Sequence, residues 1–487
     1  MTPSQEHETP PQEHETPPQD RVRRPLPDRV RPRTGPGRVL LVLAAAVAVT
    51  LFTATVPLLR DWFDLRVYHG AVHAWVHDGG RLYDYRVPGT AYGFTYPPFA
   101  ALVMLPMALV GLGTAVTVTL LLDLAALALV LRRLTGPEWR RLGWYGCCLV
   151  ALALALFEPL RDTVSFGQVN ILLLALVLAD AWLLASGRGR WAGAGIGLAA
   201  AVKLTPALFI GLLLLAGRWR AAGVATGVAG GATLCAAWAA PDASRFYWTE
   251  ALWDTSRIGR PEYVSNQSLQ GVLARLGAPD RALWAVLVLL VLVLWAWRAR
   301  RAAKAEDWTA AFALTGLAAC LVSPITWVHH LVWLLPSFAV LVRAGHPRTA
   351  GALYAVLCTS VVWLWADDPS RPGALLGSNA YAWITLGLLA ALPVAHSSSG
   401  RPATSRMPSA TTPAPSPAAP ATAADSAQPG PSCAGGAAAT AGAAAGPDCP
   451  RTRSASSEPT GSTRPAASNP QSSRARASSY TAKPPPR

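Results

Sequence analysis

Long apolar runs alternate with short polar joints along most of this chain. The first run, residues 39–59, has about the length with which one helix crosses a bilayer. Further runs predict helices over the ranges 97–131, 144–157, 168–186, 191–203, 204–217, 221–240, 282–298, 308–322, 328–343, 348–366 and 381–395. Together they make about 12 crossings, so the pattern predicts an all-α polytopic membrane protein.

Two places in this pattern depart from simple spans. Residues 97–131 are long enough for two crossings and are interrupted at Gly111-Leu112-Gly113, so we expect one broken passage or a partial hairpin there. The runs 191–203 and 204–217 are short for a span. They predict half-depth helices that line a cavity, where irregular backbone is tolerated within a membrane.

Basic residues predict the orientation of the spans. Seven arginines lie between residues 21 and 38, directly before the first run, which predicts a cytoplasmic N-terminus in the plasma membrane. The Arg-rich joints expected on the same side are 132–141, 188–190, 218–220 and 298–304. An even number of crossings returns the C-terminus to the cytoplasm. The outer face then collects the segments 60–96, 158–167, 241–281 and 323–327.

The two ends of the chain differ in composition from its middle. Residues 1–38 repeat QEHETPP at 5–11 and 12–18, and residues 397–487 are rich in Ala, Pro, Ser and Thr. Both ends lack the apolar content that would offset the entropy lost on ordering. The sequence therefore predicts two disordered cytoplasmic tails around a membrane domain, residues 39–396.

The overall composition supports the membrane class. Of 487 residues, 52% are hydrophobic and 14% are charged, whereas soluble proteins carry about 25% charged residues. A net charge of +15 would suit nucleic acid, but the arginines lie in the tails and at span ends, so we expect no nucleic-acid partner. The seven cysteines form no C-x-x-C pair and are interpreted as small apolar side chains and incidental tail thiols.

The first outer segment begins with two carboxylates, in RDWFDLRVYHG at 60–70. Either would cost several kcal/mol in the bilayer core. Asp61 is interpreted as a cap of the next helix or as a residue that ends the span in water. For Asp64 we favour a functional role over these structural ones.

A histidine stripe follows these acids. The stretch VYHGAVHAWVHDGG predicts a short amphipathic helix at the membrane interface that stops at Gly79-Gly80. His69, His73 and His77 share one face of it, and two histidines at this spacing can chelate zinc. No further ligand and no H-E-x-x-H pattern accompany them, so we favour a polar interfacial stripe and expect no metal.

Further polar residues lie at the entrances of later spans. Tyr96, in YGFTYPPFAAL, belongs to an aromatic cluster that fits an interfacial belt or a platform on which a sugar stacks. Gln168 and Asn170, in GQVN, can hydrogen-bond a polar substrate or join helices.

Three basic side chains complete the candidate set. Lys203 lies between two apolar stretches, where it either snorkels to an interface or faces a polar cavity and binds an anion such as phosphate. His329 and His330 open a span from the outer face. Such a pair is commonly structural, but beside a phosphate it could donate hydrogen bonds or protons.

Seven motifs occur in an order typical of one enzyme family: DLRVYHG, GGRLYD, FTYPPFAAL, GQVNILLLAL, GIGLAAAVKLTP, SNQSLQGVL and SPITWVHHLVWLLP. They resemble the polyprenyl-phosphate-sugar-dependent glycosyltransferases of the type-C membrane fold. More specifically, the chain resembles the actinobacterial α-1,2-mannosyltransferases of glycosyltransferase family 87. The resemblance covers about residues 39–396 and omits both tails.

The resemblance implies an inverting transferase. It would move mannose from a polyprenyl-phosphate-mannose donor to a hydroxyl of a lipid-linked or cell-envelope glycan, at the outer face, forming an α-1,2 linkage without a cofactor. Asp64 would be the catalytic base, and the matching histidine falls on His329 or His330. We expect Lys203, His329 or His330, and Arg66 to stabilise the departing phosphate. Tyr96, Gln168 and Asn170 are the remaining candidates for substrate binding.

Two other functions compete with this one. A related transferase that uses polyprenyl-phosphate-arabinofuranose would carry the same motifs. A transporter of lipid-linked sugar would be expected to show internal repeats and a midplane site. We see no repeat between the two halves, and the polar residues gather at one face, which favours an enzyme over a transporter.

Overall fold

The computed structural model describes residues 35–55, 61–136, 142–278, 280–367 and 372–395. The chain divides into two units, Met1–Ala403 and Thr404–Arg487, and all described residues belong to the first. The predicted tails therefore lie outside the described residues, except for 35–38, which begin the first helix.

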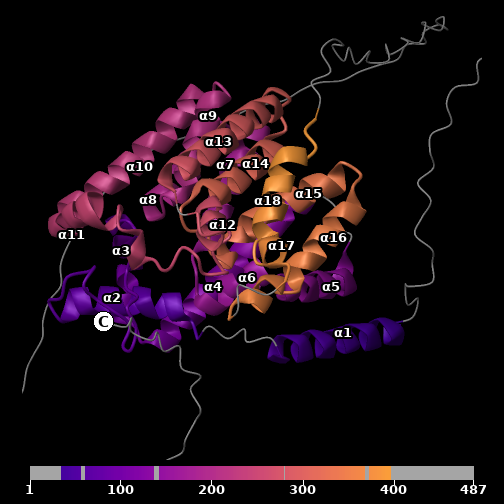
Figure 1. The fold of residues 1–487 in the computed structure, drawn as a ribbon, viewed down its shortest axis with the longest axis horizontal. Coiled ribbons are helices and arrows are strands. Elements are labelled where there is room, and N and C mark those ends of the chain that lie inside the picture. The colour runs from indigo at the N-terminus through magenta and orange to yellow at the C-terminus, as the bar shows by residue number, and fades with distance from the viewer. Residues whose placement is uncertain (1–34, 56–60, 137–141, 279, 368–371, 396–487) are drawn as a thin grey trace, which may run out of the picture. The chain divides into compact units, whose positions relative to one another are not determined.

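The regular secondary structure of the described residues is helical, apart from one isolated β-bridge between Arg86 and Gly93 (Figure 1). Its helices are α1 (Gly35–Thr55), α2 (Phe63–His77), α3 (Pro98–Met104), η2 (Leu105–Leu109), α4 (Leu112–Thr135), α5 (Gly143–Leu156), α6 (Glu158–Phe166), α7 (Asn170–Ala185), α8 (Ala194–Val202), η4 (Thr205–Ala207), α9 (Leu208–Leu215), α10 (Trp219–Ala239), α11 (Pro241–Phe246), η5 (Tyr247–Ala251), η6 (Thr255–Arg257), α12 (Leu269–Arg275), α13 (Arg281–Lys304), α14 (Trp308–Val322), η7 (Val328–Leu334), α15 (Leu335–Arg343), α16 (Pro347–Cys358), η8 (Val361–Trp365), α17 (Ala374–Gly377) and α18 (Ala380–Ala391).

Four of the described helices are long and apolar enough to cross a membrane: Gly35–Thr53 within α1, α4, α10 and α13. The pair α5 and α6, bent by 76°, would make a fifth span if it crosses as one unit. The prediction of an all-α membrane protein is therefore confirmed. The number of 12 crossings stays a prediction, because many of the other apolar helices are shorter than a bilayer is thick.

The breaks in the helices agree with the predictions from the sequence at two places and differ from them at a third. Gly111 separates η2 from α4, at the predicted interruption. The short helices α8 and α9 flank Lys203, which has an extended backbone (φ −148°, ψ 129°). The single helix predicted over 348–366 is wrong, because α16 ends at Cys358 and Ser360 adopts a left-handed conformation (φ 57°) before η8.

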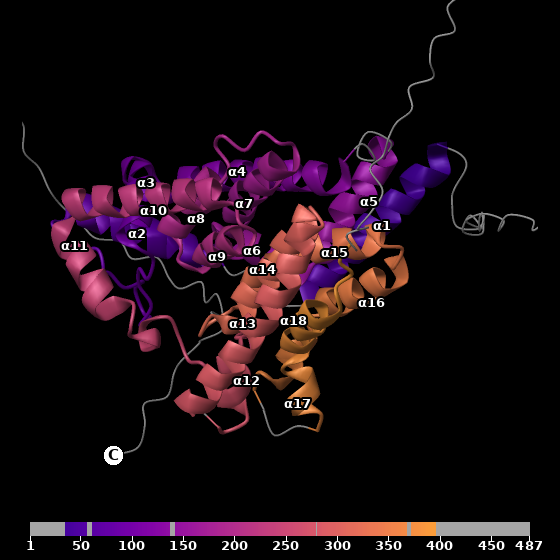
Figure 2. The same cartoon turned by 90° about the horizontal axis from the view of Figure 1, so that it is seen from above.

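Helix α14 forms the centre of the described fold. Every residue from Ala310 to Leu321 is buried, as expected for a helix that is apolar on all sides. It packs along α13, with further contacts to α18, α15, α7 and α9 (Figures 1 and 2). The outer side of α13 carries exposed apolar residues, among them Leu283, Val286, Leu289 and Leu290.

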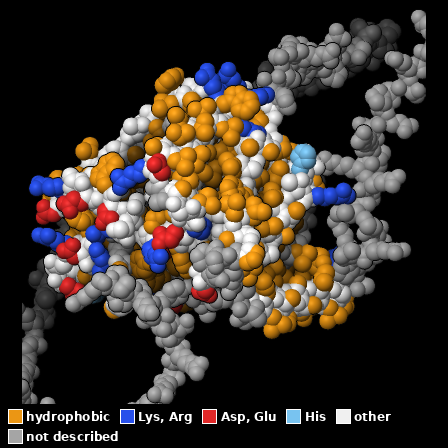
Figure 3. Space-filling model, in the orientation of Figure 1, with side chains coloured by type: hydrophobic (Ala, Val, Ile, Leu, Met, Phe, Trp, Pro, Cys, Tyr) orange, Lys and Arg blue, Asp and Glu red, His pale blue; other side chains and the backbone are white. Residues whose placement is uncertain are grey.

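The surface separates apolar from charged side chains. Figure 3 shows hydrophobic side chains over the middle of the visible face and charged side chains of both signs at its left edge, in the region of α2 and α11. A contiguous exposed apolar surface of this kind is typical of a protein that contacts lipid.

Close packing of α8 against two neighbours positions the residue that follows it. A Cβ atom added at Gly197 would lie 2.4 Å from the Ala225 carbonyl oxygen of α10. On the other side, the Asp180 carboxylate of α7 accepts the Ile196 N–H at 2.7 Å. These contacts hold α8 between α7 and α10 and so determine where Lys203 emerges.

We expect Gly197→Leu to destabilise the protein, because the added side chain meets the α10 backbone. Overpacking of this kind costs about 1–3 kcal/mol. The matched control is Gly227→Leu on α10, since a Cβ atom at Gly227 meets nothing within 4 Å. Thermal unfolding of the detergent-solubilised protein should show a lower midpoint for Gly197→Leu only. Equal midpoints for the two variants would contradict this packing.

Candidate active site

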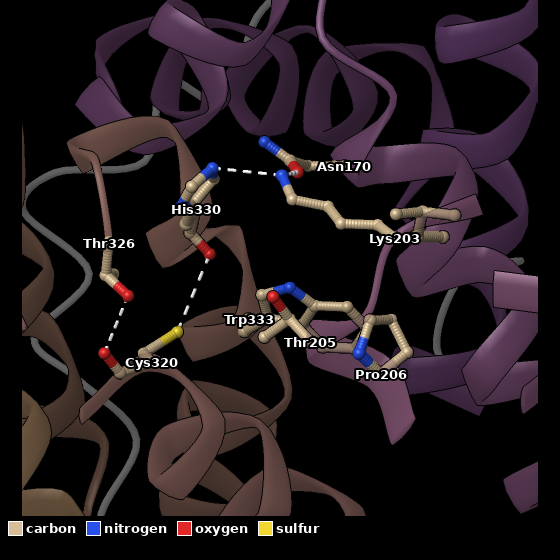
Figure 4. Close-up of a pocket in the computed structure, with 9 residues that line it drawn as sticks. Asn170, Lys203, Thr205, Pro206, Cys320, Thr326, His330 and Trp333 are labelled. Carbon is tan, nitrogen blue, oxygen red and sulfur yellow. Dashed lines mark hydrogen bonds between the residues drawn. The ribbon is translucent and has the colours of Figure 1, made fainter. Parts of the chain in front are cut away.

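Polar side chains from five separate segments meet in one largely buried cluster. The segments are the start of α2, the loop before α3, the junction of α6 and α7, the break after α8, and the 3₁₀ helix η7. The side chains are Asp64, Tyr96, Gln168, Asn170, Lys203 and His330. In Figure 4, Asn170, Lys203 and His330 point toward one another from different elements. The structure thus brings together six of the eight side chains predicted from the sequence.

Asp64 lies in the first turn of α2, where a carboxylate is favoured by the helix dipole. Gln168 Nε2 donates a hydrogen bond to its Oδ2 at 2.5 Å. The preceding Gly167 makes this approach possible: it has a left-handed backbone (φ 70°), and a Cβ atom there would lie 2.6 Å from Cβ of Leu65. The second oxygen, Oδ1, accepts no hydrogen bond from the residues that the structure describes.

The surroundings of Asp64 make it a better base than an ordinary aspartate. Burial raises the pKa of Asp64 to about 6, because an apolar environment disfavours the charged carboxylate. The hydrogen bond from Gln168 and the charge of Lys203 act in the opposite direction but do not cancel the effect of burial. A carboxylate with this pKa is mostly charged at neutral pH and still takes up a proton readily.

A chain of hydroxyl groups orients the amide of Gln168. Tyr68 donates to the Tyr96 hydroxyl at 3.0 Å, and Tyr96 donates to Gln168 Oε1 at 2.9 Å. Since Oε1 accepts from Tyr96, Nε2 must face Asp64. Tyr68 was missed in the sequence analysis. It lies four residues after Asp64, so the same-face rule for helices could have identified it.

Lys203 places its amine among polar groups rather than against a carboxylate. Its Nζ donates to Asn170 Oδ1 at 2.9 Å and to the Tyr96 hydroxyl at 3.3 Å, and it lies 5.2 Å from the centre of the Tyr96 ring. It forms no ion pair within the described residues. Of the two roles predicted for Lys203, the geometry favours the amine in a polar cluster.

The two adjacent histidines contribute differently. The Trp327 N–H donates to Nδ1 of His330 at 3.2 Å, which assigns the ring proton to Nε2. This nitrogen lies 3.0 Å from Nζ of Lys203. Both nitrogens carry N–H groups, so an anionic oxygen placed between them could accept a hydrogen bond from each.

His329 takes part in the cluster through its backbone. Its carbonyl accepts from Thr163 Oγ1 at 2.9 Å and from Asn170 Nδ2 at 3.2 Å, and its ring packs 5.1 Å from that of Phe166. The sequence left open which histidine acts. The geometry points the ring of His330 toward Lys203.

A small pocket lies beside Lys203 and His330 (Figure 4). It is lined by Asn170, Leu173, Lys203, Thr205, Pro206, Cys320, Thr326, His330 and Trp333. Its volume of about 10 Å³ is room for roughly one water molecule. The pocket marks where the polar groups converge and is too small to hold a sugar. Thr326 and Trp333 belong to the SPITWVHHLVWLLP motif but were not predicted as site residues, and Cys320 carried no distinguishing sequence signal.

Arg66, Asp61 and the histidine stripe make their contacts outside this cluster. Arg66 is two residues after Asp64 and so projects from a different side of α2, where it pairs with the exposed Asp61. Asp61 makes this ion pair and no capping bond to α2, which has no side-chain cap. Of the histidine stripe, His69 contacts the carbonyl oxygen of Val110 at 2.8 Å and His77 that of Ala108 at 3.0 Å, so both satisfy the backbone at the end of η2.

The SNQS motif supports η7 from the second outer segment. Asn266 and Ser268 both donate to the Pro324 carbonyl, at 3.3 and 2.9 Å, and Asn266 Oδ1 accepts the Thr326 N–H at 2.9 Å. These bonds fix the backbone just before His330. The motif therefore acts in positioning the cluster rather than in contacting it.

Comparison with known proteins shows which family and which relatives this chain is similar to. A family model described as Glycosyltransferase family 87 matches residues 94–324. The chain is 34% identical over 374 residues to the polyprenol-phosphate-mannose-dependent alpha-(1-2)-phosphatidylinositol mannoside mannosyltransferase of Mycolicibacterium smegmatis, covering 69% of this chain and 84% of that protein. The protein of the same name from Mycobacterium tuberculosis is 33% identical over 358 residues, covering 67% and 83%.

A third relative has a related name. The polyprenol-phosphate-mannose-dependent alpha-(1-2)-phosphatidylinositol pentamannoside mannosyltransferase of M. smegmatis is 36% identical over 330 residues, covering 64% of this chain and 77% of that protein. No solved structure matches the chain significantly. Relatives above 30% identity that are matched over most of their length establish the resemblance seen in the motifs, and the chain belongs to glycosyltransferase family 87.

Proposed function

We propose that this enzyme transfers mannose from a polyprenyl-phosphate-mannose donor to a hydroxyl of a phosphatidylinositol mannoside or a similar envelope glycolipid, forming an α-1,2 linkage. The named activities of three relatives support the donor and the acceptor. The observation that carries the proposal is the cluster itself. It holds one carboxylate of raised pKa next to a pair of N–H donors, Lys203 and His330.

The chemistry needs one base and one anion site. The acceptor oxygen attacks the anomeric carbon of mannose, and the bond from that carbon to the phosphate oxygen breaks. The proton of the acceptor hydroxyl passes to Asp64, and the electron pair of the broken bond leaves on polyprenyl phosphate. A single displacement inverts the anomeric centre without a covalent intermediate. We propose that no cofactor takes part, because phosphate is already a good leaving group.

The departing phosphate gains negative charge as the bond breaks. Donors placed at the position where charge develops stabilise the transition state more than the ground state. Lys203 Nζ and His330 Nε2 are 3.0 Å apart and can bind one phosphate oxygen together. Asn170 and Tyr96 hold the lysine in place, and Gln168 orients the base. Arg66 is proposed to have no direct part, since it pairs with Asp61.

We further propose the type-C glycosyltransferase fold with about 12 crossings, a membrane domain over residues 39–396, and cytoplasmic tails on either side. Hydrogen bonds support a common outer face in the plasma membrane. Residues 60–96 and 158–167 meet through Trp62 N–H and Ser165 O (2.9 Å). Residues 241–281 and 323–327 meet through Asn266 and Thr326 (2.9 Å). An active site there can receive a lipid donor from the bilayer and a glycolipid acceptor from the surface.

The role of Asp64 is tested by an isosteric replacement. We expect Asp64→Asn to lower transfer of radiolabelled mannose by at least about 100-fold, since a general base contributes roughly 10²–10⁴-fold. The control is Asp61→Asn, three residues away, which removes an exposed carboxylate paired with Arg66. Membranes should contain equal amounts of each protein. Comparable transfer by Asp64→Asn and the wild type would remove Asp64 from the mechanism.

The pH dependence follows from the raised pKa of Asp64. The charged carboxylate is the active form, and it is lost as the pH falls through about 6. We therefore expect kcat/KM for the acceptor to fall below about pH 6, approaching tenfold per pH unit. The Asp61→Asn enzyme should follow the wild-type profile. A flat profile down to pH 5 would contradict the assignment of Asp64 as the base.

The donor sugar separates the competing functions. We expect label from polyprenyl-phosphate-mannose, and none from polyprenyl-phosphate-arabinofuranose, to enter the glycolipid fraction in the presence of a chelator. An α-1,2-specific mannosidase should then release the label. Transfer from the arabinose donor alone would indicate the related transferase. Passage of labelled donor across vesicles without any transfer would indicate a transporter.

A further inference from the structure

Two arginines from different segments converge on one backbone oxygen. Arg86 Nη1 donates to the Tyr83 carbonyl at 2.7 Å and to the Tyr85 carbonyl at 2.8 Å. Arg257 Nη2, from η6, donates to the same Tyr83 carbonyl at 2.7 Å. The two guanidinium groups are therefore neighbours, although like charges repel.

No described carboxylate forms an ion pair with either guanidinium. Arg66 and Arg260, in the same two outer segments, pair with Asp61 and Glu262. The exposed Asp84 is the acid whose charge acts on Arg86, but it does not reach ion-pair distance. Burial and the charge of Arg257 lower the pKa of Arg86. Nε of Arg257 is buried and has no hydrogen-bond partner among the described residues.

The surrounding aromatic residues hold the pair in place. The Arg257 guanidinium lies 5.2 Å from the centre of the Phe246 ring. Tyr83 packs against Phe246 and Tyr247, with ring centres 5.5 and 5.9 Å apart. Gly93 allows the chain to pass Arg86 closely, since a Cβ atom there would lie 2.6 Å from Nη1. Two cations kept together by the packing, with spare N–H groups, form a site suited to an anion.

The pair is connected to the active-site cluster through Tyr83. The Tyr83 hydroxyl donates to the backbone oxygen of Tyr96 at 2.7 Å, and the Tyr96 side chain belongs to the cluster. The carbonyl of Tyr83 holds the arginines and its hydroxyl holds the Tyr96 backbone. An anion at the arginines would therefore lie at a fixed separation from Asp64, on the same outer surface.

We propose that Arg86 and Arg257 bind the phosphodiester of an anionic glycolipid acceptor. The proposal rests on the proposed function. It adds a second binding site, here called the anchor, in which Arg86 and Arg257 hold the phosphodiester of the acceptor. Planar guanidinium groups bind phosphate oxygens with paired hydrogen bonds, which suits an inositol phosphodiester. The donor phosphate has a separate site at Lys203 and His330. The anchor holds the lipid end of the acceptor while a sugar hydroxyl reaches Asp64.

The test compares two acceptors that end in the same mannose, a phosphatidylinositol mannoside and an uncharged alkyl mannoside. For Arg86→Gln and Arg257→Gln we expect the KM of the phosphatidylinositol mannoside to rise at least about tenfold, the loss typical of one charge-assisted hydrogen bond. The KM of the alkyl mannoside, the KM of the donor and kcat should change less than about twofold. Arg260→Gln is the matched control, because Glu262 already neutralises Arg260.

Each contrary result identifies a different error. An equal rise in KM for both acceptors would mean that the arginines only stabilise the contact between their two segments, 60–96 and 241–281. A rise in donor KM would assign the pair to the donor's phosphate. Unchanged constants would remove the pair from binding.

A second measurement is independent of catalysis. Binding of the phosphatidylinositol mannoside to the purified, detergent-solubilised enzyme without donor should weaken at least about tenfold in Arg86→Gln and Arg257→Gln, but not in Arg260→Gln. This readout still tests the anchor if the wild type transfers no mannose, a result that would refute the proposed function alone. Binding equal to wild type in all three variants would refute the anchor.

Discussion

The candidate active-site cluster depends on keeping a carboxylate and an ammonium near each other, in apolar surroundings, without a direct ion pair. Gln168 and Tyr96 achieve this separation. The amide of Gln168 contacts Asp64, and the Tyr96 hydroxyl bridges Gln168 and Lys203. A direct ion pair would stabilise the charged carboxylate and weaken its affinity for a proton. The two intervening side chains therefore keep Asp64 basic and leave the lysine amine available for the proposed phosphate contact.

This arrangement explains why so many helices are interrupted around the cluster. Asp64 and Asn170 begin helices, Gln168 lies between two helices, and Lys203 lies at a break between α8 and η4. His330 lies in a 3₁₀ helix. Each interruption turns a side chain inward and frees backbone groups that need partners. Within a membrane such backbone is tolerated only inside protein or along a cavity, so the breaks mark the site as well as shaping it.

Much of this could be predicted from the sequence, because apolar runs and breaks are local properties. The interruption at Gly111 and the short helices around Lys203 are examples. The left-handed turn at Ser360 was not predictable, since Gly, and less often Asn or Asp, are the residues that usually adopt this conformation. The separate roles of His329 and His330 depend on contacts between segments far apart in the chain. Motif order identified the family, but only the folded chain shows which ring faces the lysine.

On the proposed function, a phosphate can enter this cluster only if one of its donors moves. Lys203 Nζ and His330 Nε2 are 3.0 Å apart, and the pocket beside them holds roughly one water molecule. His330 is held at its other nitrogen by the Trp327 N–H, whereas the lysine has a long flexible side chain. On the proposed function, the lysine is the donor that moves, exchanging its hydrogen bonds to Asn170 and Tyr96 for one to the phosphate.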